Sequence, residues 1–201
     1  MRRILLFLLL FVSVPLHAAT LMVLGDSLSA GYGLEPGQGW VDLLAQRLQQ
    51  DRPAYSVVNA SISGETSAGG LARLDASLNQ ARPTLLLLEL GANDGLRGLS
   101  LKALRQNLDQ IVTRAQKHGA RVVLIGMRLP PNYGKQYTEA FHQTYVDLAA
   151  RRHLPLVPFL LEGVALDPGL MQADQMHPTA KAQPALLDTV WHTLAPLLVS
   201  K

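Results

Sequence analysis

The fold can be read outward from residues 21–29, Leu21-Met22-Val23-Leu24-Gly25-Asp26-Ser27-Leu28-Ser29, where an apolar run meets a small polar turn. The apolar residues predict a short buried strand. Residues 30–33 follow with two glycines, which favour a sharp change of direction. Ser27 is therefore expected at the carboxyl end of a strand, where open α/β sheets place their ligand sites. The alternative is an ordinary strand-exit turn, because Asp and Ser side chains often bond nearby backbone there.

Apolar runs and amphipathic stretches alternate along the rest of the chain. The runs predict five strands, over Thr20–Leu24, Tyr55–Asn59, Thr84–Leu90, Arg121–Met127 and Leu156–Phe159. The amphipathic stretches predict helices over Trp40–Gln50, Gly70–Leu78, Leu101–Lys117, Tyr137–Ala149 and Thr179–Leu198. This alternation is typical of one α/β domain with a doubly wound, five-stranded parallel sheet, for which precedent gives the strand order 2-1-3-4-5.

The first 19 residues have the layout of a secretory signal peptide: a positive start, an apolar segment over Ile4–Val14, and small residues before Thr20. The apolar segment is shorter than the ~20 residues that span a bilayer. We therefore expect a signal peptide over residues 1–19 and one domain over residues 20–201, in a periplasmic or secreted protein. The alternative is an N-terminal anchor that is retained. The chain has no cysteine, which excludes disulfides and a lipid-modified N-terminus.

The charge balance gives no reason to expect nucleic acid or an acidic membrane as a partner. Lys and Arg number 18 and Asp and Glu number 15. Removal of the signal segment takes away Arg2 and Arg3, which leaves 16 positive against 15 negative residues, a net charge of +1. Such a chain lacks the field that steers polyanions. With no coiled-coil pattern, we expect a monomer with no stable membrane anchor after processing.

Polar and small residues follow the predicted strands at Ser27, Gly64 and Asn93, and Asp174 and His177 follow the last strand. The carboxyl ends of parallel strands meet at one edge of a sheet, so these residues are expected on one surface. A serine hydroxyl needs a base to take its proton, and a carboxylate can orient that base. The set therefore indicates acyl transfer, with Ser27 as nucleophile, His177 as base and Asp174 as the orienting acid.

The tetrahedral intermediate of acyl transfer needs hydrogen-bond donors, each typically worth ~3 kcal/mol of barrier. The candidates are the N–H groups of Ser27 and Gly64 and the side chain of Asn93. Each residue also has a simpler interpretation: Gly64 could merely adopt a positive φ angle, and Asn93 could form an ordinary turn. Asp174 and His177 could likewise be a loop-capping pair.

Other chemistries fit the sequence less well. There is no cysteine pair and no His-Glu-x-x-His motif, so no zinc ligand set is recognisable and we expect no metal or organic cofactor. Gly31 and Gly33 lack the third glycine of a dinucleotide fingerprint. Ser29 takes the last place of the Gly-x-Ser-x-Gly elbow, which argues against an α/β-hydrolase.

Four blocks resemble those of the SGNH (GDSL) hydrolase superfamily: residues 25–29, Gly64, Gly91-x-Asn93-Asp94 and Asp174-x-x-His177. Residues 59–64, 95–98 and 129–134 are more closely similar to the bacterial thioesterase I/protease I/lysophospholipase L1 (arylesterase) group. The resemblance implies a flavodoxin-like three-layer α/β/α domain that cleaves esters and thioesters through an acyl-serine intermediate. It implies the same catalytic and oxyanion-hole residues as above, and a loop over Asp94–Leu99 that borders the acyl site and moves on binding.

Candidate substrate-binding residues surround these blocks: Asp26, Leu28, Asp94, Leu96, Leu129 and Tyr133, with Leu99 as a further leucine near the site. We expect a broad-range hydrolase of acyl thioesters, lysophospholipids and aryl esters. One alternative is a carbohydrate deacetylase, although Trp40 and Tyr133 are the only obvious rings for stacking on a sugar. A second is a non-catalytic binder of lipid or nucleotide, which would have no need of a base beside a serine.

Overall fold

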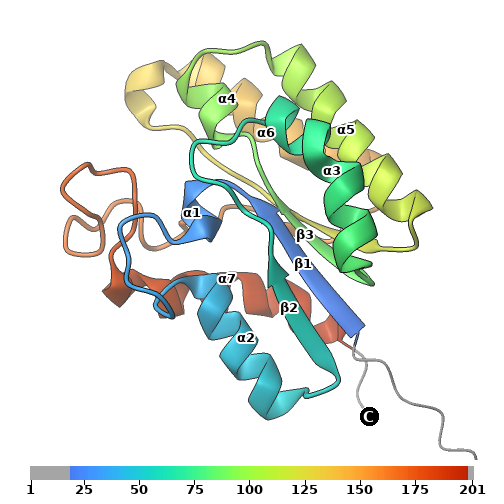
Figure 1. Ribbon diagram of the computed structural model, residues 1–201. Coiled ribbons are helices and arrows are strands. Elements are labelled where there is room, and N and C mark those ends of the chain that lie inside the picture. The colour runs from blue at the N-terminus through green and yellow to red at the C-terminus, as the bar shows by residue number, and fades with distance from the viewer. Residues whose placement is uncertain (1–18, 199–201) are drawn as a thin grey trace, which may run out of the picture.

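The structure is a computed structural model that describes residues 19–198 (Figure 1). Its centre is a five-stranded parallel sheet in the order β2-β1-β3-β4-β5. The strands are β1 (Ala19–Gly25), β2 (Tyr55–Asn59), β3 (Leu85–Glu89), β4 (Arg121–Ile125) and β5 (Leu156–Val157). This is the fold class and strand order that the sequence predicts. The predicted signal peptide lies outside the described residues, except for Ala19.

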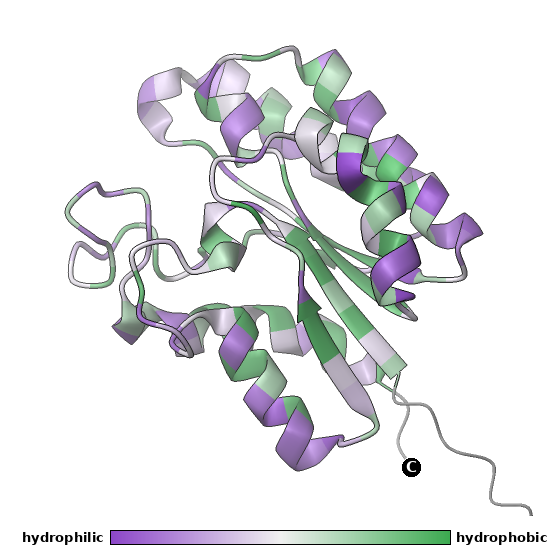
Figure 2. Cartoon of the chain, in the orientation of Figure 1, coloured by the Kyte–Doolittle hydropathy of each residue, from purple (hydrophilic) through white to green (hydrophobic). Residues whose placement is uncertain are grey.

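Helices cover both faces of the sheet and complete three layers (Figure 1). One face carries α2 (Trp40–Asp51) and α7 (Gln183–Leu194), and the other carries α3 (Ser67–Ala81), α5 (Leu101–Lys117) and α6 (Lys135–Arg152). Each of these helices turns apolar residues toward the strands and polar residues outward, as Figure 2 shows. Two short helices, α1 (Ser27–Ala30) and α4 (Ala92–Leu96), follow β1 and β3. Short 3₁₀ turns lie at Pro131–Tyr133, Ala180–Ala182 and Ala195–Leu197.

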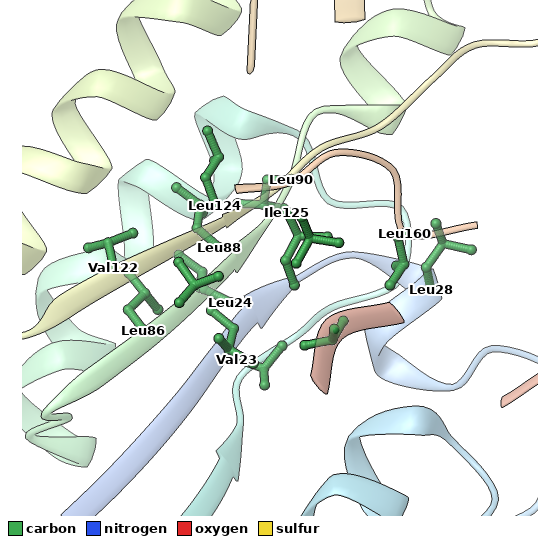
Figure 3. Packing of buried hydrophobic residues seen from close by; sticks show 14 of the residues in the cluster. Val23, Leu24, Leu28, Leu86, Leu88, Leu90, Val122, Leu124, Ile125 and Leu160 are labelled. Carbon is green, nitrogen blue, oxygen red and sulfur yellow. The ribbon is translucent and has the colours of Figure 1, made fainter. Parts of the chain in front are cut away.

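The core fills the space between the helices and the central strands. All residues of β3 are buried, and its leucines pack beside those of β1 and β4 (Figure 3). A strand that is apolar on both faces can lie only in the middle of a covered parallel sheet. The leucine run therefore fixes β3 at the centre, between β1 and β4.

Several element boundaries differ from the sequence prediction for local reasons. Helix α3 begins earlier than predicted because the Thr66 side chain caps it, accepting the N–H of Gly69. Strand β5 keeps only two residues, since Pro155 and Pro158 flank it and cannot donate to a ladder. The last predicted helix, over Thr179–Leu198, consists of α7 with a 3₁₀ turn at each end.

The carboxyl ends of the strands lie along one edge of the sheet. Ser27 follows β1, Gly64 lies in the loop after β2, Asn93 follows β3, and the segment after β5 returns to the same edge with His177. Among residues 19–198, no helix combines the length and the apolar composition that crossing a membrane requires.

Candidate active site

Ser27 is the first residue of α1, and one residue, Asp26, separates it from the end of β1. The Asp26 carboxylate caps this short helix by accepting the Leu28 N–H at 3.1 Å. Gly31 ends it with a φ of 76°, a left-handed conformation that favours glycine. The turn is thereby fixed on both sides, and the Ser27 side chain opens into a pocket.

Ser27, His177 and Asp174 form a continuous chain of hydrogen bonds. His177 Nε2 lies 2.9 Å from Ser27 Oγ, and His177 Nδ1 lies 2.6 Å from Asp174 Oδ2. Asp174 Oδ1 accepts the N–H groups of Met176 at 2.9 Å and His177 at 3.0 Å. Partial burial works against ionisation, but the hydrogen bonds from His177 and the two N–H groups outweigh it and lower the pKa of Asp174 to about 2. An ionised carboxylate can hold the imidazole with Nε2 free to take a proton.

The three proposed oxyanion donors border the same pocket. Gly64 has a φ of 77°, and Arg97 donates a hydrogen bond to its carbonyl at 2.9 Å, which fixes the peptide. The carboxamide nitrogen of Asn93 donates to Asp26 Oδ2 at 3.1 Å and to Glu65 O at 2.9 Å. Within residues 19–198, the N–H groups of Ser27 and Gly64 donate to no protein acceptor.

The pocket has a volume of about 710 Å³ and runs between the segment after β4 and the segment after β5. Four of the residues proposed to bind substrate line it: Asp26, Leu28, Leu96 and Leu129. Apolar residues that the sequence does not single out make up much of the remaining wall, among them Met127, Phe159, Leu161, Leu166, Met171 and Met176. The shape and chemistry of this space suit an acyl chain.

Asp94 and Tyr133, for which the sequence predicts a substrate-binding role, do not line the pocket. Asp94 is buried, and its carboxylate accepts hydrogen bonds from the N–H and hydroxyl of Ser67 at 2.8 and 2.5 Å. Residues 93 and 94 are neighbours in α4, so their side chains project in different directions. Tyr133 donates its hydroxyl to the carbonyl of Leu96, a lining residue, at 3.1 Å. Leu99 is also absent from the lining.

Tyr32 is a pocket residue that the sequence analysis missed. Its ring lies 4.5 Å from the His177 ring, centroid to centroid, at an interplanar angle of 39°. Gln172 joins the two segments, because its side-chain nitrogen donates to the Tyr32 carbonyl at 2.9 Å and to the Pro178 carbonyl at 3.0 Å. The sequence signal for Tyr32 is an aromatic residue between two turn glycines, Gly31 and Gly33.

Two buried carboxyl groups lie beneath the Ser27 turn. Burial raises the pKa of Asp26 to about 6, with the Leu28 N–H, His177 and Asn93 opposing the rise. Burial and the nearby Asp26 carboxyl raise the pKa of Glu89 well above its usual range. No group of three His, Asp or Glu side chains in residues 19–198 is arranged to hold a metal ion.

A doubly wound sheet with a hydrogen-bonded Ser–His–Asp chain at its carboxyl edge and an apolar pocket beside the serine defines the class of serine acyl hydrolases. The chain belongs to the GDSL-like lipase/acylhydrolase family, whose model matches residues 23–184. The predicted superfamily and the prediction of an ester-cleaving enzyme are thereby confirmed, and the hypothesis of a non-catalytic binder is wrong.

Two relatives and one solved structure show how similar the chain is to known proteins. The chain is 55% identical to esterase TesA of Pseudomonas aeruginosa over 181 residues, covering 90% of each chain. It is 46% identical to thioesterase 1/protease 1/lysophospholipase L1 of Escherichia coli K12 over 193 residues, covering 96% of this chain and 91% of the relative. A crystal structure of TesA superposes with a TM-score of 0.87 at 55% identity, over 89% of this chain and 99% of the other.

Proposed function

We propose that this enzyme hydrolyses acyl esters and thioesters, including lysophospholipids and aryl esters, with Ser27 as the nucleophile. The observation that carries the proposal is the Ser27–His177–Asp174 hydrogen-bond chain at the mouth of an apolar pocket of about 710 Å³. The names of the relatives, an esterase and a thioesterase with lysophospholipase activity, agree with this substrate range.

In the acylation step, His177 takes the Ser27 proton as the hydroxyl oxygen attacks the carbonyl carbon of the substrate. The carbonyl oxygen becomes negative and is stabilised by the Ser27 and Gly64 N–H groups and the Asn93 carboxamide. Since that carboxamide already has two acceptors, one of its N–H bonds is shared with the oxyanion. The intermediate collapses when His177 gives its proton to the leaving alcohol or thiol, which leaves an acyl group on Ser27.

Deacylation repeats the sequence with water as the nucleophile. His177 takes a proton from water, the hydroxide attacks the acyl carbon, and the same donors stabilise the oxygen. The proton then returns to Ser27 and the carboxylic acid is released. Asp174 stays ionised throughout and stabilises the imidazolium that forms in both steps.

No observation favours the carbohydrate deacetylase that the sequence left open. Trp40, one of the two candidate stacking rings, is fully buried in the core. Tyr133, the other, is absent from the pocket lining and bonds the Leu96 carbonyl. The apolar lining suits an acyl chain better than a polyhydroxylated ring.

We further propose that the enzyme acts as a monomer in the periplasm or outside the cell, after removal of residues 1–19. The basis is the signal-peptide pattern and the lack of a coiled-coil pattern in the sequence. Its partners are then small acyl substrates alone.

The test of the proposed function uses purified protein on p-nitrophenyl esters and acyl-CoA thioesters of increasing chain length. Wild type is expected to turn over both sets, and Ser27→Ala to lose about 10³-fold or more in kcat, since only binding and the oxyanion donors remain. The matched control is Ser63→Ala, which changes a serine of the same pocket outside the hydrogen-bond chain. Equal activity of wild type and Ser27→Ala would exclude Ser27 as the nucleophile.

A further inference from the structure

Glu89 lies at the end of the central strand, directly beneath the turn that carries Ser27. Its side chain is completely buried. Oε2 accepts the Ser29 hydroxyl at 2.7 Å and the Asp26 N–H at 3.2 Å, so one oxygen holds the turn at two points. The strand packs tightly here, since a Cβ added to Gly25 would lie only 2.5 Å from the same oxygen.

The second carboxyl oxygen of Glu89, Oε1, has no hydrogen-bond partner in the described part of the chain. The ion pairs among residues 19–198 include none with Glu89, and the titratable group that acts on its charge is another acid, Asp26. A buried charge without a counter-ion is very costly, and an unpaired neutral hydroxyl, which protonation would place at Oε1, costs far less. The surroundings of Glu89 therefore favour its protonated form.

The two acids of this buried pair differ in the support they receive. Asp26 accepts the Leu28 N–H and the Asn93 carboxamide, and it is close enough to His177 to be stabilised by the positive imidazolium. Glu89 has only the contacts to the turn. The titratable and polar groups that face the pair come from four further elements: Ser29 in α1, Asp94 in α4, Tyr145 in α6 and His177 in the segment after β5. Where two acids share a site, the less supported one keeps the proton.

We propose that Glu89 is a positioning residue that works in its neutral form, holding the Ser27 turn by two hydrogen bonds and leaving the single negative charge of the buried pair on Asp26. Asp26 in turn holds the Asn93 carboxamide at the oxyanion position. The kinetic part of this inference rests on the proposed function. The protonation of Glu89 does not, because burial and contacts alone determine it. The high pKa that burial gives Glu89 agrees with this assignment.

The proposal predicts that an amide replaces Glu89 better than a shorter acid. Glu89→Gln keeps the acceptor oxygen for Ser29 and Asp26 and has the shape of the neutral acid, so kcat should stay within about threefold of wild type. Glu89→Asp keeps the carboxyl but withdraws it from the turn, and a displaced nucleophile can cost about 10²-fold. We expect Glu89→Asp to lower kcat by about 10-fold to 100-fold with KM nearly unchanged.

The kinetic experiment combines rate measurements with a titration of the folded active sites. Each variant is assayed for kcat and KM and titrated with an alkylphosphonate ester that labels the nucleophilic serine, so that misfolded protein is subtracted. Ser29→Ala is the matched variant: it removes one of the two hydrogen bonds to Glu89 without changing either carboxyl. We expect it to fall between Glu89→Gln and Glu89→Asp in kcat.

Two further readouts report the protonation state directly. Infrared difference spectra should show the carbonyl stretch of a protonated carboxyl in wild type at pH 7, and its loss in Glu89→Gln. The acid limb of the pH profile of kcat/KM should be the same in both proteins, since the substitution removes no charge. An ionised Glu89 would instead raise the pKa of Asp26. Removing that negative charge in Glu89→Gln would then shift the acid limb to lower pH.

The outcomes separate this inference from the proposed function. Absence of the protonated-carboxyl band, or a shifted acid limb in Glu89→Gln, would overturn the neutral Glu89. Glu89→Asp as active as wild type would overturn its positioning role. If wild type hydrolysed none of the esters and failed to react with the phosphonate, the proposed function would fail, and the infrared band would still decide the protonation of Glu89. If Glu89→Asp did not fold, Ser29→Ala would decide the positioning role through its kcat.

Discussion

Among single residues, Asp26 has two roles at the site: it caps α1 and accepts a hydrogen bond from the Asn93 carboxamide. In Asp26→Asn, the remaining oxygen can still accept the Leu28 N–H, and the new NH₂ group then faces the Asn93 NH₂ group. Two donors repel, so Asn93 should leave its position, and the oxyanion donor that we propose would be lost. We expect kcat to fall by about 10²-fold to 10³-fold with little change in KM, measured on a p-nitrophenyl ester. A large rise in KM at constant kcat would contradict this role.

The same substitution should change how stability depends on pH. The pKa of Asp26 is raised from 3.8 to about 6 in the folded protein, so between about pH 4 and pH 6 the folded state binds more protons than the unfolded state. The free energy of unfolding of wild type therefore falls as pH rises through this window, by roughly 2–3 kcal/mol in total. Asp26→Asn removes this loss. Measured by urea unfolding, the free energy of unfolding of the variant relative to wild type should increase between pH 4 and pH 8.

Asp174 supplies an internal control for that experiment. Its pKa is lowered to about 2, so its contribution to stability is present above its unfolded pKa of about 4 and is lost as pH falls toward 2. The sign is opposite to that of Asp26, and the loss at low pH should persist in Asp26→Asn. A variant whose advantage over wild type is the same at pH 4 and pH 8 would contradict the assignment to Asp26.

The ring of Tyr32 packs against the imidazole of His177, the proposed base. The ring is about half exposed, and it borders the pocket beside His177. Tyr32→Leu should lower kcat by about 2-fold to 5-fold, since a cation beside an aromatic face gains about 0.5–1 kcal/mol at an exposed site. Tyr32→Phe keeps the ring and is the control. If the two variants lose the same activity, the hydroxyl matters and the packing does not.

At the scale of elements, the site depends on how the segment after β5 is joined to the turn after β1. Gln172 makes that junction: its N–H donates to the His177 carbonyl at 2.7 Å, and its side chain reaches the carbonyls of Tyr32 and Pro178. Gln172→Leu keeps the bulk and removes both side-chain hydrogen bonds. We expect about a 10-fold loss of kcat, since His177 then sits less firmly over Ser27.

A matched control for this junction lies in the loop before α2. Gln38 is more exposed than the half-buried Gln172, and its side chain accepts the Glu35 N–H at 3.1 Å without touching the pocket. Gln38→Leu should leave kcat unchanged within about twofold, as surface substitutions usually do. Equal losses in the two variants would mean that the Gln172 side chain does not support the base.

The helices and strands show how far the fold of this protein can be predicted from its sequence. The leucine run of β3 can only be a central strand, so the sheet and its order followed from pattern and precedent. The pairing of Ser27 with His177 followed from the meeting of strand ends at one edge. Asp94 lies outside the pocket lining because a short helix, α4, turns it away from Asn93, and the sequence pattern does not reveal that helix.

Contacts between distant residues account for the remaining differences. Glu89 accepts a hydrogen bond from Ser29, a residue 60 positions earlier. A single acid in an apolar run does not indicate which distant residue it contacts. Much of the pocket wall comes from the segment after β5, whose course depends on local turns and on one isolated bridge between Met171 and Pro178. Turn geometry of this kind leaves little periodic signal in a sequence.

At the scale of the whole molecule, the N-terminal boundary is set by β1, which lies inside the sheet between β2 and β3. Ala19 is its first residue, and its N–H donates to the Ala54 carbonyl at 2.6 Å. Leu21 and Met22 are completely buried. A cut that spares the fold must therefore fall before Leu21.

We predict that the full chain, expressed in a Gram-negative host, yields an active periplasmic enzyme that begins at Ala19 or Thr20. Osmotic-shock extraction followed by intact-mass measurement checks both the compartment and the first residue. A protein produced directly from Ala19 should unfold at the same urea concentration as the exported one, whereas one that begins at Val23 loses two buried side chains, each worth about 2–5 kcal/mol, and should not fold stably. Recovery of active enzyme with residues 1–18 still attached would contradict cleavage and favour the retained anchor.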